Sequence, residues 1–366
     1  MEDIYLITLK YTITKHSRNT RGVEPKMKRL TGKQLAELLG VSPSTVSNVL
    51  NGRYDRVSDA TKKRVWDAVE EHGITHLRDR DQRKIREKRN LVFIALSDHA
   101  NEWFLGNLQG IADVCRKRNY ILSQVLFPVW DPDYFRFVLS TLDFCGALVI
   151  STMNHPITDL LKTFRVPYVM IDSYDDDTKY NTVHLDNFQG AFTAVNYLIE
   201  LGHRRIGFLA GSSIWSSGVY RELGYRAALA KHQIAWDPKL EYNGSFTHFG
   251  GLMGAEILLD RNPDLTAIFA ASDEMAMGAL KTASELGLRV PSDLSIIGFD
   301  GHSLGQLGHV PLTTVDTNPF MVGVNACEML VGMLESGSSE VAKVVMDVVL
   351  SVRNTTGRPK FLVAAK

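Results

Sequence analysis

The sequence predicts a mixed α/β protein in which a small all-α unit precedes a larger, two-lobed α/β body with parallel sheets. Near the N-terminus, apolar residues recur at helical spacing between capping residues and glycines. From residue 91 onward, short apolar segments alternate with helical stretches, which is the rhythm of βαβ units. The strands are expected at 91–96, 147–151, 168–171, 205–210, 267–270 and 295–299.

Length and charge define the kind of protein further. The chain has 366 residues, of which 45% are hydrophobic, so it can form two or three domains with ordinary cores. The net charge is zero, but residues 26–90 carry 16 Lys and Arg against 9 Asp and Glu, and residues 91–366 carry 21 against 29. A compact basic unit on an acidic body suits a small domain that replaces counterions along a phosphate backbone. The alternative is a solvated basic face.

The cysteines and the chain start indicate a cytoplasmic protein. Cys115, Cys145 and Cys327 show no CxxC spacing and no neighbouring histidine cluster, so we expect core residues in a reducing compartment, with no metal and no cofactor. No apolar run approaches the ~20 residues that span a bilayer. Residues 1–4 lack the basic start of a secretory signal. We therefore expect no membrane partner.

Residues 31–73 contain a helix-turn-helix pattern. Thr31 can cap a first helix that ends at Gly40, and Ser42 can cap a second helix with Pro43 at its first position. A third helix opens at Ser58 and ends by Gly73. The apolar face of the second helix leaves short hydrogen-bonding side chains pointing outward, namely Ser44, Thr45, Ser47, Asn48 and Asn51. Such groups can reach phosphates and base edges in a major groove.

The run Leu-Ala-Glu-Leu-Leu-Gly-Val-Ser-Pro-Ser-Thr-Val-Ser-Asn-Val-Leu-Asn-Gly, followed by residues 57–65, resembles the headpiece of the lactose-repressor (LacI) family. The resemblance implies a transcriptional regulator that binds double-stranded DNA. It places Pro43, Ser44 and Asn48 at base-reading positions, and Thr45, Ser47, Asn51 and Arg56 at phosphate contacts. Most members carry arginine at position 48, which suits guanine. Asparagine suits adenine N6 and N7, so we expect an altered operator half-site.

The linker after the headpiece departs from the family pattern. Relatives have a hinge helix whose leucine enters the minor groove and kinks the duplex. Here Arg80 and Arg83 stand where alanine and leucine would fall. Three interpretations remain open: Leu77 or Ile85 substitutes by a shift of register, the arginines enter a narrow minor groove, or the segment is a solvated charged linker.

The larger body has polar and aromatic residues just after its strands. Because ligands of open parallel sheets bind at the carboxyl ends of the strands, these residues are candidates for an effector site. Carboxylates and an arginine fork serve several hydroxyl groups at once, and aromatic faces cover the apolar side of a pyranose, so we expect a sugar or sugar derivative. The candidate effector-binding residues are Asn101, Trp103, Phe104, Asp172, Ser217, Arg221, Phe246, Ser272, Asp273 and Asp300.

Strings at 166–172, 221–225, 272–276, 297–300 and 311–315 also resemble the LacI-family core, which is like that of periplasmic sugar-binding proteins. By that resemblance Arg221 and Asp300 are the effector anchors, and Phe246 is a stacking platform. The resemblance also gives supporting roles to Asp172, Ser217, Ser272 and Asp273, and structural roles to Asp186, Asn187 and His203. Ser272 replaces a usual asparagine, and Glu102 stands where relatives often have proline.

Two other functions remain open as alternatives. A purine- or nucleoside-responsive regulator of the same family would stack Trp103 and Phe104 on a base. A sugar-modifying enzyme is the remote alternative, because no phosphate-binding glycine motif, nucleophile elbow or H-E-x-x-H is present, and we expect no catalytic residue.

The expected domain organisation follows these motifs. We expect an extension at 1–26 with Met27 as a possible natural start, a headpiece at 27–76, a hinge or linker at 77–90, an effector-binding and dimerisation domain at 91–356, and a tail at 357–366. Within the large domain, lobe 1 is expected at about 91–184 and 317–345, and lobe 2 at about 185–316 and 346–356. A homodimer would read a pseudopalindromic operator.

Overall fold

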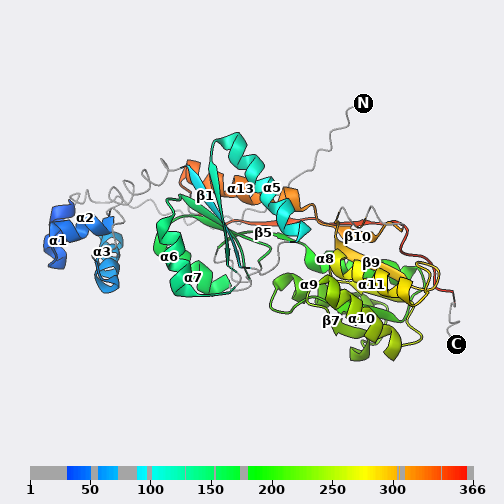
Figure 1. Ribbon diagram of the computed structural model, residues 1–366. Helices are drawn as coiled ribbons and strands as arrows, with labels where there is room; N and C mark the ends of the chain where they lie inside the picture. Colours follow the sequence, from blue (N-terminus) through cyan, green and yellow to red (C-terminus); the bar gives the residue numbers. More distant parts are fainter. Residues whose placement is uncertain are drawn as a thin grey trace, which may run out of the picture.

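The computed structural model describes residues 31–50, 57–72, 89–96, 101–127, 129–151, 154–173, 180–302, 305, 310–338 and 340–360 (Figure 1). The expectations for residues 1–26, Met27, Asn51, Arg56 and most of the linker at 77–90 lie outside these residues. None of the described helices is both long enough and apolar enough to cross a bilayer.

The headpiece consists of three helices, α1 (Gly32–Leu39), α2 (Pro43–Leu50) and α3 (Asp59–Glu71). Thr31 caps α1 through a reciprocal pair with Gln34, and Gly40 ends it at φ 63°, a left-handed conformation that favours glycine. The three helices enclose a small core of their own, made of Leu35, Ala36, Val46, Val49, Val65, Trp66, Ala68 and Val69. The predicted helix-turn-helix is confirmed.

Lobe 1 contains a six-stranded parallel sheet in the order β11-β5-β4-β3-β1-β2. Alternate residues of β1 face opposite sides, and both sides are buried, which is typical of a parallel sheet covered by helices. Helices α5 and α13 cover one face, and α6 and α7 cover the other. The elements are β1 (Asn90–Leu96), α5 (Glu102–Arg118), β2 (Ile121–Phe127), α6 (Pro132–Thr141), β3 (Gly146–Ile150), α7 (Asn154–Phe164), β4 (Tyr168–Ile171), β5 (Asn181–Leu185), α13 (Pro319–Ser336) and β11 (Lys343–Met346).

Lobe 2 contains a second six-stranded sheet in the order β12-β10-β9-β8-β6-β7. Its strands are parallel except for β12, which pairs with β10 in the antiparallel direction. Helices α8 and α9 pack together, as do α10 and α11. The elements are α8 (Asn187–Glu200), β6 (Ile206–Ala210), α9 (Ser216–Lys231), the short 3₁₀ helix η2 (Pro238–Leu240), β7 (Glu241–Asn243), α10 (His248–Arg261), β8 (Ala267–Ala270), α11 (Asp273–Glu285), β9 (Ser295–Asp300), β10 (Thr313–Asp316) and β12 (Val349–Ser351).

The chain passes between the lobes three times, after β5, after β10 and after β11. These passages place the starts of α8 and α13 beside the carboxyl ends of the strands. The predicted α/β class with an all-α headpiece is confirmed. The six strands expected from the sequence occur within one residue of the expected ends, and β12, which was not among them, pairs in the antiparallel direction.

Helices α5 and α13 approach each other at backbone distance. A Cβ added at Gly323 would lie 2.1 Å from the carbonyl oxygen of Asn107, and one added at Gly110 would lie 2.0 Å from that of Phe320. Only glycine fits there, because the obstructing atoms belong to the backbone. By contrast, Gly332 further along α13 has nothing within 4 Å of its added Cβ.

The pair Gly323→Ala and Gly332→Ala tests this packing. Gly323→Ala should lower the free energy of unfolding by about 1–3 kcal/mol, because the methyl group pushes the helices apart. Gly332→Ala should raise it by about 0.5–1 kcal/mol, because alanine favours the helix and meets no obstacle. Urea unfolding of both variants measures the two changes, and equal effects would contradict the close approach.

Candidate functional site

The candidate DNA-reading residues lie on α2. Pro43, Ser44 and Ser47 are exposed, while Thr45 and Asn48 are half-buried. The Ser42 hydroxyl accepts a hydrogen bond from the Thr45 N–H at 3.0 Å. This capping contact orders the exposed start of the helix, which is the end that a recognition helix presents to base edges.

The same serine organises the neighbouring hydroxyl groups. The Ser42 hydroxyl lies 2.7 Å from that of Ser44 and 2.8 Å from that of Thr45. The predicted contacts Asn51 and Arg56 lie outside the described residues, so the structure positions only part of the predicted DNA-reading set.

The candidate effector site is centred on Arg221, which projects from α9 and is 3% exposed. Its Nη1 lies 3.0 Å from Asp300 Oδ1 at the end of β9 and donates to the carbonyl oxygen of Ala271 at 2.5 Å. Its Nε donates to Asn187 Oδ1 at 2.8 Å. A guanidinium keeps its charge in a protein interior, so burial requires such partners.

Asn187 joins this arrangement to the other lobe. It is fully buried at the start of α8, and its Nδ2 donates to Asp172 Oδ1, at the end of β4, at 3.0 Å. Ser216 adds a second link, because its hydroxyl donates to the main-chain oxygen of Asp172 at 3.3 Å. A chain of hydrogen bonds therefore runs from lobe 1 through Asn187 to Arg221 and Asp300.

Aromatic rings and unusual backbone conformations complete the arrangement. The Arg221 guanidinium lies 3.7 Å from the ring centre of Phe299 and 5.7 Å from that of Phe246. Asp172, Phe246 and Asp300 have φ values of 51°, 62° and 117°. Side chains rarely adopt such values, and they gather at ligand sites because the surrounding structure holds them there. We call Asp172, Asn187, Arg221, Phe246, Phe299 and Asp300 the interlobe cluster.

A glycine makes room for the Phe246 ring. A Cβ added at Gly211, directly after β6, would lie 2.0 Å from an atom of that ring. The ring is half-buried and packs on this glycine. A flat aromatic ring held in this way can stack on a sugar or a base.

Asp273 lies behind the interlobe cluster. It is fully buried at the start of α11, where Oδ1 accepts from the Thr314 hydroxyl at 2.6 Å and Oδ2 accepts from the His302 N–H at 2.7 Å. Burial raises the pKa of Asp273 to about 7, and the carboxylate of Asp300 adds to the rise. His302 also reaches Asp300, with 3.9 Å between Nε2 and Oδ2.

Asp172 is a second carboxyl group near Arg221 whose pKa is shifted. Burial raises its pKa, against the opposing attraction of Arg221 and the hydrogen bond from Asn187. Asp172 and Asp300 are therefore held close to one buried cation, the guanidinium of Arg221.

The remaining predicted effector residues lie around this centre. Asn101 caps α5 by accepting from the Phe104 N–H at 3.0 Å, and Phe104 packs in the core of lobe 1, 4% exposed. Trp103 is half-buried against the same core. Ser272 caps α11, and Ser217 is buried on α9. The structure brings Asp172, Arg221, Phe246 and Asp300 together, whereas Phe104 lies mainly in the core.

The structure adds residues that sequence reasoning assigned elsewhere or missed. Asn187 was expected to be structural, and the structure makes it the link between two predicted effector residues. Asp186 and His203 occupy structural positions: Asp186 caps α8, and His203 Nε2 lies 2.9 Å from the carbonyl oxygen of Gly357. Phe299 and His302 were missed. Both flank Asp300 at the end of a predicted strand, and that adjacency was an available signal.

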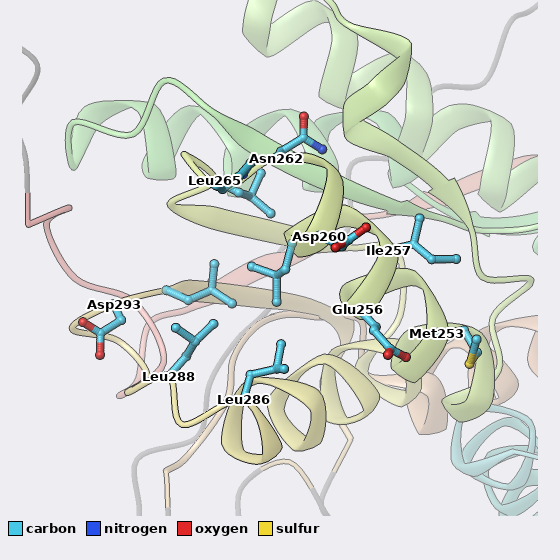
Figure 2. A pocket seen from close by; sticks show the side chains of 12 residues that line it. Met253, Glu256, Ile257, Asp260, Asn262, Leu265, Leu286, Leu288 and Asp293 are labelled. Atoms are coloured by element: carbon cyan, nitrogen blue, oxygen red, sulfur yellow. The ribbon is translucent and has the colours of Figure 1, made fainter.

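A cavity of about 650 Å³ lies elsewhere on lobe 2 (Figure 2). It is lined by α10 and by the segment after α11, with Met253, Ile257, Leu286 and Leu288 among its apolar walls and Glu256 and Asp260 on α10. None of the predicted effector residues lines it. Within the described ranges, no group of three or more His, Cys, Asp or Glu side chains is placed to hold a metal ion.

A capped helix-turn-helix joined to a two-lobed binding body defines a DNA-binding regulator. Comparison with known proteins agrees: residues 33–75 match the family of "bacterial regulatory proteins, lacI family", and residues 195–356 match the "periplasmic binding protein-like domain". The chain is 33% identical over 331 residues to the HTH-type transcriptional repressor CytR of Escherichia coli K12, covering 89% of this chain and 96% of that protein.

Two further matches concern the regulator CelR. The HTH-type transcriptional regulator CelR of Thermobifida fusca is 30% identical over 343 residues, covering 90% of this chain and 99% of that protein. A solved CelR–cellobiose complex matches with a TM-score of 0.69 and 29% identity, covering 89% of this chain and 100% of that one. The chain belongs to the LacI family and is a transcriptional regulator rather than an enzyme.

Asp273 provides a test of the buried network. A carboxyl group whose pKa is raised to about 7 contributes stability below its unfolded value near 3.8 and loses that contribution as the pH rises through 7. Asp273→Asn cannot ionise, so the fall in unfolding free energy between pH 4 and pH 7 should be smaller than in the unmodified protein. Asp264→Asn, at an exposed ion pair, serves as the control. Equal pH profiles for all three proteins would contradict the burial of an ionisable Asp273.

Proposed function

We propose that this protein is a sequence-specific repressor whose affinity for a pseudopalindromic operator is controlled by a small effector bound at the interlobe cluster. The observation that carries this proposal is the buried Arg221. Its side chain donates a hydrogen bond to Asn187, which in turn donates to Asp172 at the carboxyl end of a strand of lobe 1. An effector that replaces these contacts changes how the lobes are held. The effector can change the free energy of operator binding by no more than the difference between its binding free energies for the two arrangements of the lobes.

A sugar or sugar derivative is the proposed effector. Asp172 and Asp300 can accept from hydroxyl groups, Arg221 can donate to them, and Phe246 offers a face to an apolar ring surface. The solved regulator CelR, which is similar along most of this chain, is a complex with cellobiose. That likeness supports a carbohydrate.

A purine or nucleoside is the second candidate. It is favoured by the half-buried ring of Phe246, whose centre lies 5.7 Å from the Arg221 guanidinium, because bases stack on such rings. Trp103 is half-buried and remains a candidate for stacking, whereas Phe104 packs mainly inside lobe 1.

The DNA-binding half of the proposal assigns roles along α2. Pro43, Ser44 and Asn48 read base edges, and Thr45, Ser47, Asn51 and Arg56 contact phosphates. Two headpieces held by a homodimer read the two half-sites, and the protein works in the cytoplasm. The exposed hydroxyl groups at the start of α2 support the base-reading assignment.

Effector binding is tested by thermal unfolding of the full chain against sugars, sugar phosphates, purines and nucleosides. The cognate effector should raise the melting temperature, because it binds the folded state alone. Phe246→Ala and Arg221→Ala should remove the shift, and both should abolish the effector's influence on operator binding in a gel-shift titration. Ile257→Ala, in the cavity on lobe 2, is the matched control and should keep the shift. A shift that survives Phe246→Ala and Arg221→Ala but is lost in Ile257→Ala would contradict the proposed location.

Operator reading is tested by selecting binding sites from random duplexes. Asn48→Arg should change the preferred base opposite position 48 from adenine to guanine, by about 1–3 kcal/mol of discrimination. Ser47→Ala should instead weaken binding to all sequences alike, because a phosphate contact carries no sequence information. If Asn48→Arg leaves the selected sequences unchanged, the base-reading role is wrong.

A further inference from the structure

The chain that follows β12 is fixed along lobe 2 by hydrogen bonds. The Ile296 N–H donates to the main-chain oxygen of Thr355 at 2.8 Å, and the Thr355 hydroxyl donates back to the main-chain oxygen of Ile296 at 2.6 Å. The Gly357 N–H donates to the Ser295 hydroxyl at 3.0 Å. We call residues 352–360 the C-terminal strap. These bonds hold the strap against the start of β9.

The strap reaches the rim of the cavity on lobe 2 (Figure 2). Lys360 Nζ forms an ion pair with the carboxylate of Asp293, and Asp293 is one of the residues that line this cavity. The next residues of the sequence, Phe361, Leu362 and Val363, are all apolar. An apolar run of the chain therefore begins at the point where the strap meets the cavity.

The cavity can receive apolar side chains. Its volume of about 650 Å³ lies within the range of sites that bury a ligand, and its walls include Met253, Ile257, Leu286 and Leu288. Leu286 is 55% exposed although it is a large aliphatic residue. Covering these side chains removes apolar surface from water, which favours association.

The charges of the two parts are complementary. The lining residues include three acids, Glu256, Asp260 and Asp293, and no Lys, Arg or His of the described chain is among them. Residues 357–366 contain Arg358, Lys360 and Lys366 and no Asp or Glu. An acidic rim favours a basic and apolar segment and disfavours anions.

We propose that the cavity on lobe 2 is a docking site for the segment 361–363 of the same chain. An extended chain spans at most about 3.3–3.6 Å per residue, so this segment reaches about 10 Å beyond Lys360. The ion pair between Lys360 and Asp293 holds the segment at the rim, which gives it a high effective concentration over any free partner. Docking joins the strap to α10 and to the segment after α11. This role is independent of the effector site.

Thiol labelling at the cavity tests the docking in the full chain. The three native cysteines are buried, so a maleimide that reacts with Leu286→Cys reports the introduced thiol. Labelling should be about tenfold slower with the native segment than with a serine segment, because a docked segment must first open. The serine segment carries Phe361→Ser, Leu362→Ser and Val363→Ser. The control Leu223→Cys on α9, at a leucine that is 47% exposed, should react at the same rate with either segment.

The contrary results of this labelling are distinct. Equal rates for Leu286→Cys with the two segments would overturn the proposal: fast labelling of both leaves the cavity open, and slow labelling of both means that another molecule fills it. A mixed sample identifies a second copy as the occupant. Chains with Leu286→Cys and the serine segment are refolded together with chains that have neither change. Slow labelling in this mixture alone would assign the cavity to the partner's segment and overturn docking within one chain.

Trypsin cleavage after Lys360 gives a second measurement that needs no introduced cysteine. Mass spectrometry of the released peptide 361–366 follows the rate. Docking should protect this bond, so Leu286→Ser at the mouth of the cavity should speed its cleavage several-fold, while the matched control Leu223→Ser should not. Asp293→Asn should also speed cleavage, because it removes the charge that holds Lys360 at the rim. Cleavage that is equally fast in the unmodified protein and in Leu286→Ser would overturn the proposal.

Discussion

The buried guanidinium of Arg221 imposes the constraint on which the interlobe region depends. A charge that is 3% exposed and cannot be neutralised by losing its proton must be matched by acceptors within the protein. Those acceptors come from three elements: Asn187 at the start of α8, Ala271 at the end of β8, and Asp300 at the end of β9. Holding Arg221 in place therefore also fixes the relative positions of these segments.

The same constraint explains why both lobes contribute to the site. Asn187 uses its carbonyl oxygen for Arg221 and its amide nitrogen for Asp172, so a residue at the crossing from β5 to α8 connects a strand end of lobe 1 to a helix of lobe 2. A ligand that exchanges contacts at this point acts on the arrangement of the lobes directly.

The sequence predicted the elements whose local chemistry is sufficient to define them. The caps Thr31 and Gly40 and the apolar spacing of residues 46, 49 and 50 define α1 and α2 without tertiary information. Strand β5 was missed because its buried positions include Asn181, Thr182 and His184, which do not read as an apolar strand. Their burial depends on distant partners, such as the Ala342 N–H that donates to Asn181 Oδ1.

The residues of the candidate site also divide into those that local sequence identifies and those that only tertiary packing identifies. Arg221, Asp300 and Asp172 could be named from their places after strands and from the family resemblance, whereas the role of Asn187 depends on partners 15 and 34 positions away. No local pattern encodes that convergence. The place of Phe299 beside Asp300 was a local signal, but its contact with Arg221 arises only when β9 and α9 are packed together.

The most direct test of this account is a double-mutant cycle between Asp172→Ala and Arg221→Ala, measured by urea unfolding with Asn187 present and again with Asn187→Ala. If the hydrogen-bond chain joins the lobes, the two substitutions should be coupled by about 0.5–3 kcal/mol with Asn187 in place and should become additive without it. Additivity within about 0.5 kcal/mol in both backgrounds would show that the lobes are not connected through this network.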